Sequence, residues 1–189
     1  PNELVSIILT QKGFIKRSAV SIFRSQLRGG RGVSGMTTRN EDMIDQFSVT
    51  KAHDYLLFFT SFGRVHKMKA YLVPESSRQS KGVSISHFLN LEENETITAF
   101  IPVKDFNDQE YLFMTTKKGV VKKTALDAFS HFKNRAIIAI NLDDADQLRW
   151  VSKTTGDKDV VLITSNGMVI RFNETQARPL GRSSRGVRG

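Results

Sequence analysis

The chain alternates short apolar runs with polar segments punctuated by glycine, and one such unit recurs four times. Each apolar run leads into Thr-x-x-Gly, and the closing glycines are Gly13, Gly63, Gly119 and Gly167. The intervals between these glycines are 50, 56 and 48 residues. Runs rich in Val, Ile, Leu and Phe that end at turn residues are typical of β-strands. A period of this length is typical of stacked repeats, so the pattern predicts an array of small β-units.

The residues after each glycine also have strand character, so each unit is predicted to open with a β-hairpin. Its second strand is expected at 14–16, 65–68, 120–123 and 168–172. Asn166-Gly167 gives the clearest turn prediction, because this pair tolerates positive φ at both central positions of a type I′ turn. A further strand is expected in each spacer, as at 43–47 and 97–101. The segment 124–132 is the best candidate for a short helix.

A second glycine marks the end of the loop that follows each hairpin. Gly32, Gly82 and Gly186 each precede a valine and lie 19 residues after the turn glycine of their own unit. The third copy reads Arg135-Ala136-Ile137, is two residues shorter and lacks the glycine. Three or four short strands per unit with little helix predict an all-β, bladed, propeller-like array. We expect a single domain over 1–189, with units at about 1–38, 51–90, 108–141 and 157–189.

The charge distribution follows the same period. The chain has 28 Lys and Arg against 19 Asp and Glu, a net charge of +9. Segments 11–32, 62–82, 117–136 and 166–189 hold 22 of these cations and only 3 of the acidic residues. The other acidic residues, such as Asp143, Asp144 and Asp146, lie in spacers that we expect to be solvated rather than to bind a metal. Equivalent basic loops in a stacked array predict one cationic rim for a polyanion.

Composition narrows the class further. The absence of cysteine excludes disulfides and cysteine-based zinc sites and fits a cytosolic protein, and no apolar run approaches the length of a membrane span. The four histidines have no metal-like spacing, and Tyr55, Tyr71 and Tyr111 are expected to be packing residues. We therefore expect neither a catalytic nor a metal site in this chain. Pro1 is not an initiator methionine, which indicates a piece of a longer protein.

One loop is richer in glycine and arginine than the others: Gln26-Leu27-Arg28-Gly29-Gly30-Arg31-Gly32. Its glycines permit a close approach of the backbone to a ligand. Consecutive exposed amides can form an anion-binding concavity, and the two arginines can fork onto phosphate oxygens. This loop lacks the Lys-Ser/Thr pair of a nucleotide P-loop. The residues by themselves predict a clamp for a phosphate backbone.

The repeats and this loop together resemble the C-terminal DNA-wrapping domain of bacterial DNA gyrase A. The loop matches that family's Gln-Arg-Arg-Gly-Gly-Lys-Gly box at five of seven positions. It departs at Leu27, which removes a cation, and at Arg31, which keeps the charge. The resemblance implies a β-pinwheel, a propeller-like array of four-stranded blades that share strands between neighbours. Because the family typically has six blades, an array of about four units is expected to be truncated.

The resemblance also implies a function. Domains of this family bind duplex DNA around an outer rim and bend or wrap it, which enables ATP-dependent negative supercoiling by the gyrase holoenzyme. No cofactor is implied for this domain, since ATP and Mg²⁺ belong to other domains or to gyrase B. The implied partners are double-stranded DNA, contacted through its backbone, the rest of gyrase A, and gyrase B in an A2B2 assembly. The implied location is the bacterial cytoplasm, at the nucleoid.

The predicted DNA contacts form two sets. The box set is Gln26, Arg28, Gly29, Gly30, Arg31 and Gly32. The rim set contains cations at equivalent phases of the repeats: Lys12, Lys16, Arg17, Arg24, Arg64, Lys67, Lys69, Arg78, Lys81, Lys117, Lys118, Lys122, Lys123, Arg135, Arg171, Arg178, Arg182 and Arg185. Phe129 and Phe132, near the third basic loop, are expected in the core rather than stacked on bases.

Two alternatives remain. One is the equivalent domain of topoisomerase IV, which bends DNA without strong wrapping. The intact glycines of the box argue against it, whereas the low number of units argues for it. The other is a propeller-type protein-interaction module, although the chain has no Trp-Asp pair and no Gly-Gly doublet recurring in each unit.

Overall fold

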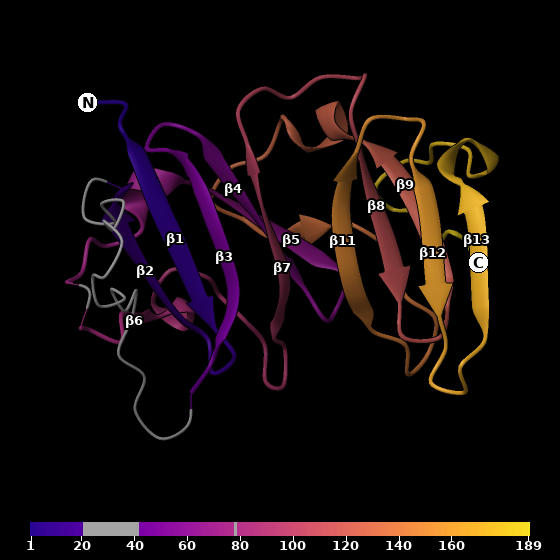
Figure 1. Ribbon diagram of the computed structural model, residues 1–189, viewed down its shortest axis with the longest axis horizontal. Helices are drawn as coiled ribbons and strands as arrows, with labels where there is room; N and C mark the ends of the chain where they lie inside the picture. Colours follow the sequence, from indigo (N-terminus) through magenta and orange to yellow (C-terminus); the bar gives the residue numbers. More distant parts are fainter. Residues whose placement is uncertain (21–41, 78) are drawn as a thin grey trace, which may run out of the picture. The chain divides into compact units, whose positions relative to one another are not determined.

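The structure is a computed structural model, and it describes residues 1–20, 42–77 and 79–189. The glycine–arginine box, Arg24 and Arg78 lie outside the described residues. The described part is all-β, as expected, with short 3₁₀ turns (η) as its helical elements (Figure 1).

The strands of the first half are β1 (Leu4–Thr10), β2 (Phe14–Ala19), β3 (Ile44–Lys51), β4 (Tyr55–Thr60), β5 (Arg64–Lys69), β6 (Val83–Ser84) and β7 (Ile97–Val103). The strands of the second half are β8 (Tyr111–Thr116), β9 (Val120–Ala125), β10 (Ile137–Ile138), β11 (Leu148–Thr154), β12 (Asp159–Ile163), β13 (Val169–Asn173) and β14 (Val187–Arg188). The 3₁₀ turns are η2 (Ala70–Leu72), η3 (Ile85–His87), η4 (Leu126–Phe129) and η5 (Glu174–Gln176).

The Thr-x-x-Gly signature closes each hairpin through its own hydrogen bonds. In all four copies the threonine carbonyl accepts the amide of the glycine at 3.0 Å. The threonine hydroxyl accepts the amide of the residue after the glycine, at 3.0 to 3.3 Å. The glycines have φ between +77° and +85°, where a residue with a Cβ is strained by about 1–2 kcal/mol. Five consecutive residues therefore specify each turn.

Two local predictions are wrong in detail. Gly167 has φ of +82° but Asn166 is not in the positive-φ region, so the turn is not type I′ over Asn166-Gly167. Its centre is one residue earlier, with the glycine closing it, because the threonine bonds fix that position. The helix expected at 124–132 is instead the end of β9 followed by the single turn η4. Thr124 pairs with Leu112 of β8, so cross-strand pairing wins over local helix preference.

Each four-stranded sheet takes its last strand from the next repeat. The strand orders are β3-β1-β2-β6, β10-β5-β4-β7 and β11-β8-β9-β14. In each sheet the hairpin lies in the middle, the spacer strand that follows it lies on one side, and an exchanged strand (β6, β10 or β14) lies on the other. The Gly-Val signal, or Ala136-Ile137 in the third copy, begins this exchanged strand. The fourth hairpin, β12-β13, forms a two-stranded sheet within the described residues.

The chain divides into two compact units. The first comprises 1–57, 68–94 and 102–104, and the second comprises 58–67, 95–101 and 105–189. The first sheet belongs to the first unit, the third and fourth sheets belong to the second, and the strands of the second sheet contribute to both. Phe129 is fully buried and meets Phe59 edge-on, with ring centres 6.0 Å apart, so its expected core role is confirmed.

Candidate nucleic-acid interface

Strand exchange carries a cation from one repeat to the hairpin of the preceding repeat. The residue two positions before each exchanged strand is basic and exposed: Lys81, Arg135 and Arg185. We call the segments 79–82, 133–136 and 181–186 the exchange loops. Each exchanged strand pairs with the first residues after a hairpin turn, as Val83 does with Ile15. Because this pairing is antiparallel, each exchanged strand runs toward the turn, and the exchange-loop cations lie two residues farther from the turn than the start of that strand. We call the end of each sheet that carries the turn the turn end.

The turn ends of the first and third sheets gather further cations. In the first sheet the Lys81 Nζ lies 4.0 Å from the centre of the Phe14 ring, and Phe14 directly follows the turn that carries exposed Lys12. In the third sheet the turn carries Lys117 and Lys118, both exposed. Arg188 of β14, also exposed, pairs with Val120 beside that turn. Cations from two successive repeats thus share one end of a sheet.

Two of the three exchange loops, 79–82 and 181–186, require glycine because they pass directly over the preceding hairpin. Gly82 has φ of +86°, and a Cβ there would lie 2.5 Å from the Ile15 carbonyl oxygen. Gly186 has φ of +88°, and a Cβ there would lie 2.4 Å from the Val121 carbonyl oxygen. A side chain at either position would displace backbone, since no real Cβ approaches an oxygen so closely. The pairs Gly82-Val83 and Gly186-Val187 therefore mark strand exchange.

A second group of repeated cations is buried and holds the exchange loops. Lys16, three residues after its turn glycine, is fully buried. Its ammonium donates to the carbonyls of Ser77 and Ser80 at 3.1 Å each, which fastens the exchange loop of the next repeat onto β2. Burial lowers the pKa of Lys16, because the charged form loses hydration.

Lys122 occupies the same position in the third sheet. Its ammonium donates to the carbonyls of Ala139 and Arg182, the latter in the exchange loop of the fourth repeat. Burial, aided by the Arg182 charge, lowers the pKa of Lys122 to about 7. His66 stands at this position in the second sheet, whose exchanged strand comes from the copy that is two residues shorter, and its buried Nε2 has no hydrogen-bond partner among the described residues. Burial and Arg64 lower the pKa of His66 against the opposing effect of Glu95.

The following position, four residues after the glycine, holds a 3₁₀ turn of the next repeat. The three donor–acceptor pairs are Arg17 Nε to Val73 O at 2.8 Å, Lys67 Nζ to Ser130 O at 2.8 Å, and Lys123 Nζ to Glu174 O at 3.0 Å. Each acceptor lies within or directly after η2, η4 or η5. Cations therefore recur three and four residues after the turn glycine because they bind backbone carbonyls of the next repeat.

These contacts correct part of the predicted rim. Lys16, Lys122 and Lys123 are buried donors to backbone carbonyls, so they are not surface cations. Half-buried members with intramolecular partners are Arg17, Arg64, Lys67, Lys69 and Arg182. The exposed members are Lys12, Lys81, Lys117, Lys118, Arg135, Arg171, Arg178 and Arg185. Arg24, Arg78 and the box residues Gln26, Arg28, Gly29, Gly30, Arg31 and Gly32 lie outside the described residues.

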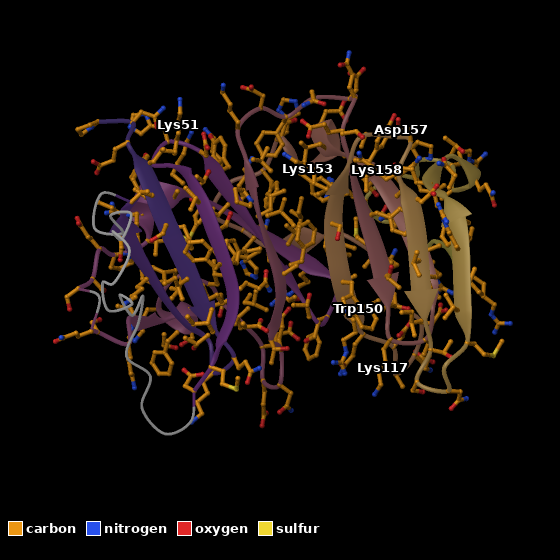
Figure 2. The ribbon with its side chains drawn as sticks, viewed as in Figure 1. Lys51, Lys117, Trp150, Lys153, Asp157 and Lys158 are labelled. Carbon is orange, nitrogen blue, oxygen red and sulfur yellow. The ribbon has the colours of Figure 1, made fainter. Side chains whose placement is uncertain are left out.

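Several exposed cations are not among the predicted rim residues. They are Lys51, Lys104, Lys133, Arg149, Lys153, Lys158 and Arg188. Lys133 and Arg188 fall inside the basic segments and could have been found by their charge. Figure 2 shows that Lys51 lies at the opposite end of its own strand from the first turn, and that Lys153 lies far from Lys117.

Three acidic spacer residues are also buried, contrary to the expectation of solvated spacers. Asp42 accepts the Lys12 amide at 3.1 Å, and Asp146 accepts the Lys118 amide at 2.9 Å. Glu95 accepts the Thr60 hydroxyl at 2.6 Å and forms an ion pair with Arg64. Each carboxylate thus fastens the spacer to a hairpin turn. The alternation of charge along the chain therefore partly reflects spacer carboxylates that bind the hairpin turns.

Repeated hairpins that exchange an edge strand with the following repeat define a β-pinwheel, a variety of propeller. The chain belongs to the family described as DNA gyrase C-terminal domain, beta-propeller, whose sequence model matches residues 7–51, 54–104, 110–155 and 158–189. The matched segments follow the four repeats, each of which contains one hairpin.

Known proteins agree with this assignment. The chain is 44% identical over 187 residues to DNA gyrase A of Clostridium acetobutylicum, covering 99% of the chain and 22% of that protein. It is 47% identical over 190 residues to DNA gyrase A of Staphylococcus epidermidis, covering 100% of the chain and 21% of that protein. The chain therefore spans about a fifth of the length of these curated relatives.

Two solved structures share the fold over nearly the whole chain. The C-terminal domain of DNA topoisomerase IV has a TM-score of 0.85 at 25% identity, covering 100% of this chain and 57% of that one. The DNA gyrase A C-terminal domain has a TM-score of 0.75 at 28% identity, covering 99% of this chain and 60% of that one. Among the described residues of the present chain, no helix is long and apolar enough to cross a membrane.

Proposed function

We propose that this chain binds and bends duplex DNA across the exchange loops and turn ends of its sheets, as part of a DNA gyrase. The observation that carries the proposal is the exposed exchange-loop cation, Lys81, Arg135 or Arg185, that each four-stranded sheet receives from the next repeat. Family membership supports the same function, since the relatives are subunits of gyrase.

The physical terms favour a backbone-reading interface. Duplex DNA carries one negative charge per about 1.7 Å of axis, so cations that recur with the repeats meet many phosphates. Bending 20–30 bp by 40–90° costs on the order of 1–6 kcal/mol, which several phosphate contacts can offset. Little base recognition is needed, and we expect weak sequence preference.

The full proposal places the chain in an enzyme. Bound DNA is wrapped and presented to the cleaving domains of gyrase A, with ATP hydrolysis and Mg²⁺ on other domains or on gyrase B of an A2B2 assembly. The enzyme acts in the bacterial cytoplasm at the nucleoid. The box residues, Arg28 and Arg31 above all, are proposed to contribute to wrapping more than to simple binding.

Salt dependence tests the interface directly. The triple variant Lys81→Gln, Arg135→Gln, Arg185→Gln removes the exchange-loop cations. The matched control Lys51→Gln, Lys104→Gln, Lys158→Gln removes three exposed charges near the strand ends away from the turns.

Affinity for a labelled 30-bp duplex is measured by fluorescence anisotropy at several salt concentrations. Each lost phosphate contact lowers the slope of log K against log salt by about 0.9, so we expect a reduction of about 2 to 3 for the first variant. We expect almost no change of slope for the control. Equal slopes for both variants would contradict the proposed interface.

The topology of a relaxed plasmid tests wrapping. The chain is bound to the plasmid, a nicking-closing topoisomerase relaxes the remainder, and the linking number is read after protein removal. We expect a salt-sensitive positive shift that an Arg28→Gln, Arg31→Gln variant loses. The same double substitution in the full-length protein should reduce supercoiling by the reconstituted enzyme, and unchanged supercoiling would count against the role of the box.

A second candidate function is bending without strong wrapping, as in a topoisomerase IV domain. The higher TM-score to the topoisomerase IV structure favours it, whereas the high identity to gyrase A sequences favours gyrase. Duplex binding without any shift in linking number would select this second function.

A further inference from the structure

The edge of the third sheet carries an unusual exposed aromatic residue. Trp150 of β11 is the sole tryptophan of the chain, and 61% of its surface is accessible. Tryptophan is among the more buried residue types, and its indole combines a large apolar face with one N–H donor. An indole left in water on an edge strand is therefore a candidate contact for a partner.

A β-bulge sets the orientation of this residue. Leu148 pairs with Thr116 and Trp150 pairs with Thr115, so Arg149 is the extra residue in the ladder. A bulge of this kind disrupts the strict alternation of side chains and re-aims one of them. Leu148 and Val151 are buried, whereas Arg149 and Trp150 between them are both exposed.

Two exposed cations lie at the same end of the sheet as the indole, Lys117 in the turn and Arg149 next to Trp150 in sequence. The Lys117 amide donates to the Gln147 carbonyl at 2.8 Å, which holds the turn against the start of β11. Figure 2 shows Trp150 and Lys117 at the same end of the sheet. Within the described residues, neither Lys117 nor Arg149 forms a salt bridge. We call Lys117, Arg149 and Trp150 the β11 patch.

The β11 patch continues the proposed DNA-binding surface across the sheet. Arg188 lies on the opposite edge strand, β14, at the same turn end. Four strands spaced about 4.8 Å apart place these edges about 14 Å from each other, a length over which duplex DNA carries about eight charges. One duplex can therefore contact both edges of the third sheet.

We propose that the β11 patch is a DNA contact in which Trp150 packs against the sugars of the duplex while Lys117 and Arg149 bind flanking phosphates. The chemistry of the patch favours DNA over a protein partner. The other exposed residues of β11 are Arg149, Ser152 and Lys153, so the indole has no apolar surround on its strand. A lone aromatic ring among cations suits the backbone of a duplex, where apolar sugars alternate with charged phosphates. This inference rests on the proposed function.

The fluorescence of the single tryptophan reports the contact without any substitution. The 189-residue chain is titrated with an unlabelled 30-bp duplex at low salt, while anisotropy of a labelled duplex measures binding independently. We expect the emission of Trp150 to be quenched and shifted to shorter wavelength in parallel with binding, because the indole leaves water.

Substitutions then measure how much each residue of the β11 patch contributes to duplex affinity. Trp150→Ala is expected to weaken duplex affinity about 5-fold or more with an unchanged salt slope, because the lost contact is not ionic. Lys117→Gln with Arg149→Gln should instead lower the slope by about 2. Phe47→Ala is the control, since Phe47 is 56% exposed on the equivalent edge strand β3 but has no cation adjacent in sequence.

The proposal requires both the change in Trp150 emission on binding and the loss of affinity in Trp150→Ala. Duplex binding with unchanged Trp150 emission, or with the same affinity in Trp150→Ala as in the unmodified chain, would overturn the β11 patch and leave the proposed function standing. Absence of duplex binding by anisotropy would remove both proposals together.

Discussion

The buried ammonium of Lys122 makes stability depend on pH in a defined direction. Its pKa falls from 10.5 to about 7 in the folded chain, mainly through burial. Below pH 7 the group is charged in both the folded and the unfolded state, so the cost of burying the charge is present in full. Between pH 7 and 10.5 the unfolded chain holds a proton that the folded chain has lost, so the free energy of unfolding rises with pH across this window.

The sign follows from proton counts, and the magnitude follows from the two pKa values. In this window the unfolded state binds more protons than the folded state, so raising the pH favours the folded state and the free energy of unfolding rises. One pH unit corresponds to about 1.36 kcal/mol, so titration of Lys122 adds roughly 2 kcal/mol of stability between pH 7 and pH 9. The neutral amine retains two N–H donors, which match the carbonyls of Ala139 and Arg182. The exchange loop therefore stays attached when the proton leaves.

Lys122→Met tests this reasoning because it keeps an unbranched side chain, one atom shorter, and removes both donors. Two unpaired buried carbonyls cost about 1–3 kcal/mol each, so we expect the variant to be about 2–4 kcal/mol less stable at pH 9. At pH 7 the unmodified chain bears the cost of the charge, and the gap should be about 2 kcal/mol smaller.

Urea unfolding at pH 7, 8 and 9 measures the gap, with exposed Lys117→Met as the control. A gap that is the same at pH 7 and pH 9 would refute the reasoning, because it would mean that Lys122 keeps its ordinary pKa. A gap near zero at pH 9 would refute the role of the two carbonyl bonds.

Two further predictions concern stability, and urea unfolding measures both. Glu95→Gln should cost about 2–4 kcal/mol, because buried Glu95 pairs with half-buried Arg64 and accepts the hydroxyl of buried Thr60. Asp159→Asn, in an exposed pair, should change nothing measurable, and equal effects would contradict the burial argument. Gly82→Ala should destabilise the chain far more than Gly13→Ala. Both glycines have φ above +80°, but the new Cβ would clash with a backbone oxygen only at Gly82 and would lie 3.6 Å from Ile85 at Gly13. Similar losses would mean that backbone strain, rather than the clash, governs both sites.

The hairpins could be predicted from the sequence because their determinants are local. The threonine, the glycine and the residue after it make all the bonds that close each turn. The strand after each glycine and the strand in each spacer were found for the same reason. At Asn166 the local prediction is wrong, because the hydrogen bonds of the threonine two positions earlier, and not the dipeptide preference, fix the position of the turn.

The exposed cations could also be predicted from the sequence. Lys81, Arg135 and Arg185 precede a strand start at one phase of the repeat, and all three are exposed. The burial of Lys16 and Lys122 could not be predicted, because these residues recur with the same regularity as the exposed cations and carry the same charge. What distinguishes them is a segment from the next repeat, whose carbonyls lie 61 and 64 residues from Lys16 in the chain.

The amino-acid sequence by itself determined the repeat, the turns, the all-β class and the net positive charge, since these depend on residues within a few positions of one another. The tertiary structure alone decided which strand is exchanged, which cations and carboxylates are buried, and that Trp150 is exposed on an edge strand beside Lys117. The physical reason is that burial and hydrogen-bond partners depend on segments that meet only when successive repeats pack together.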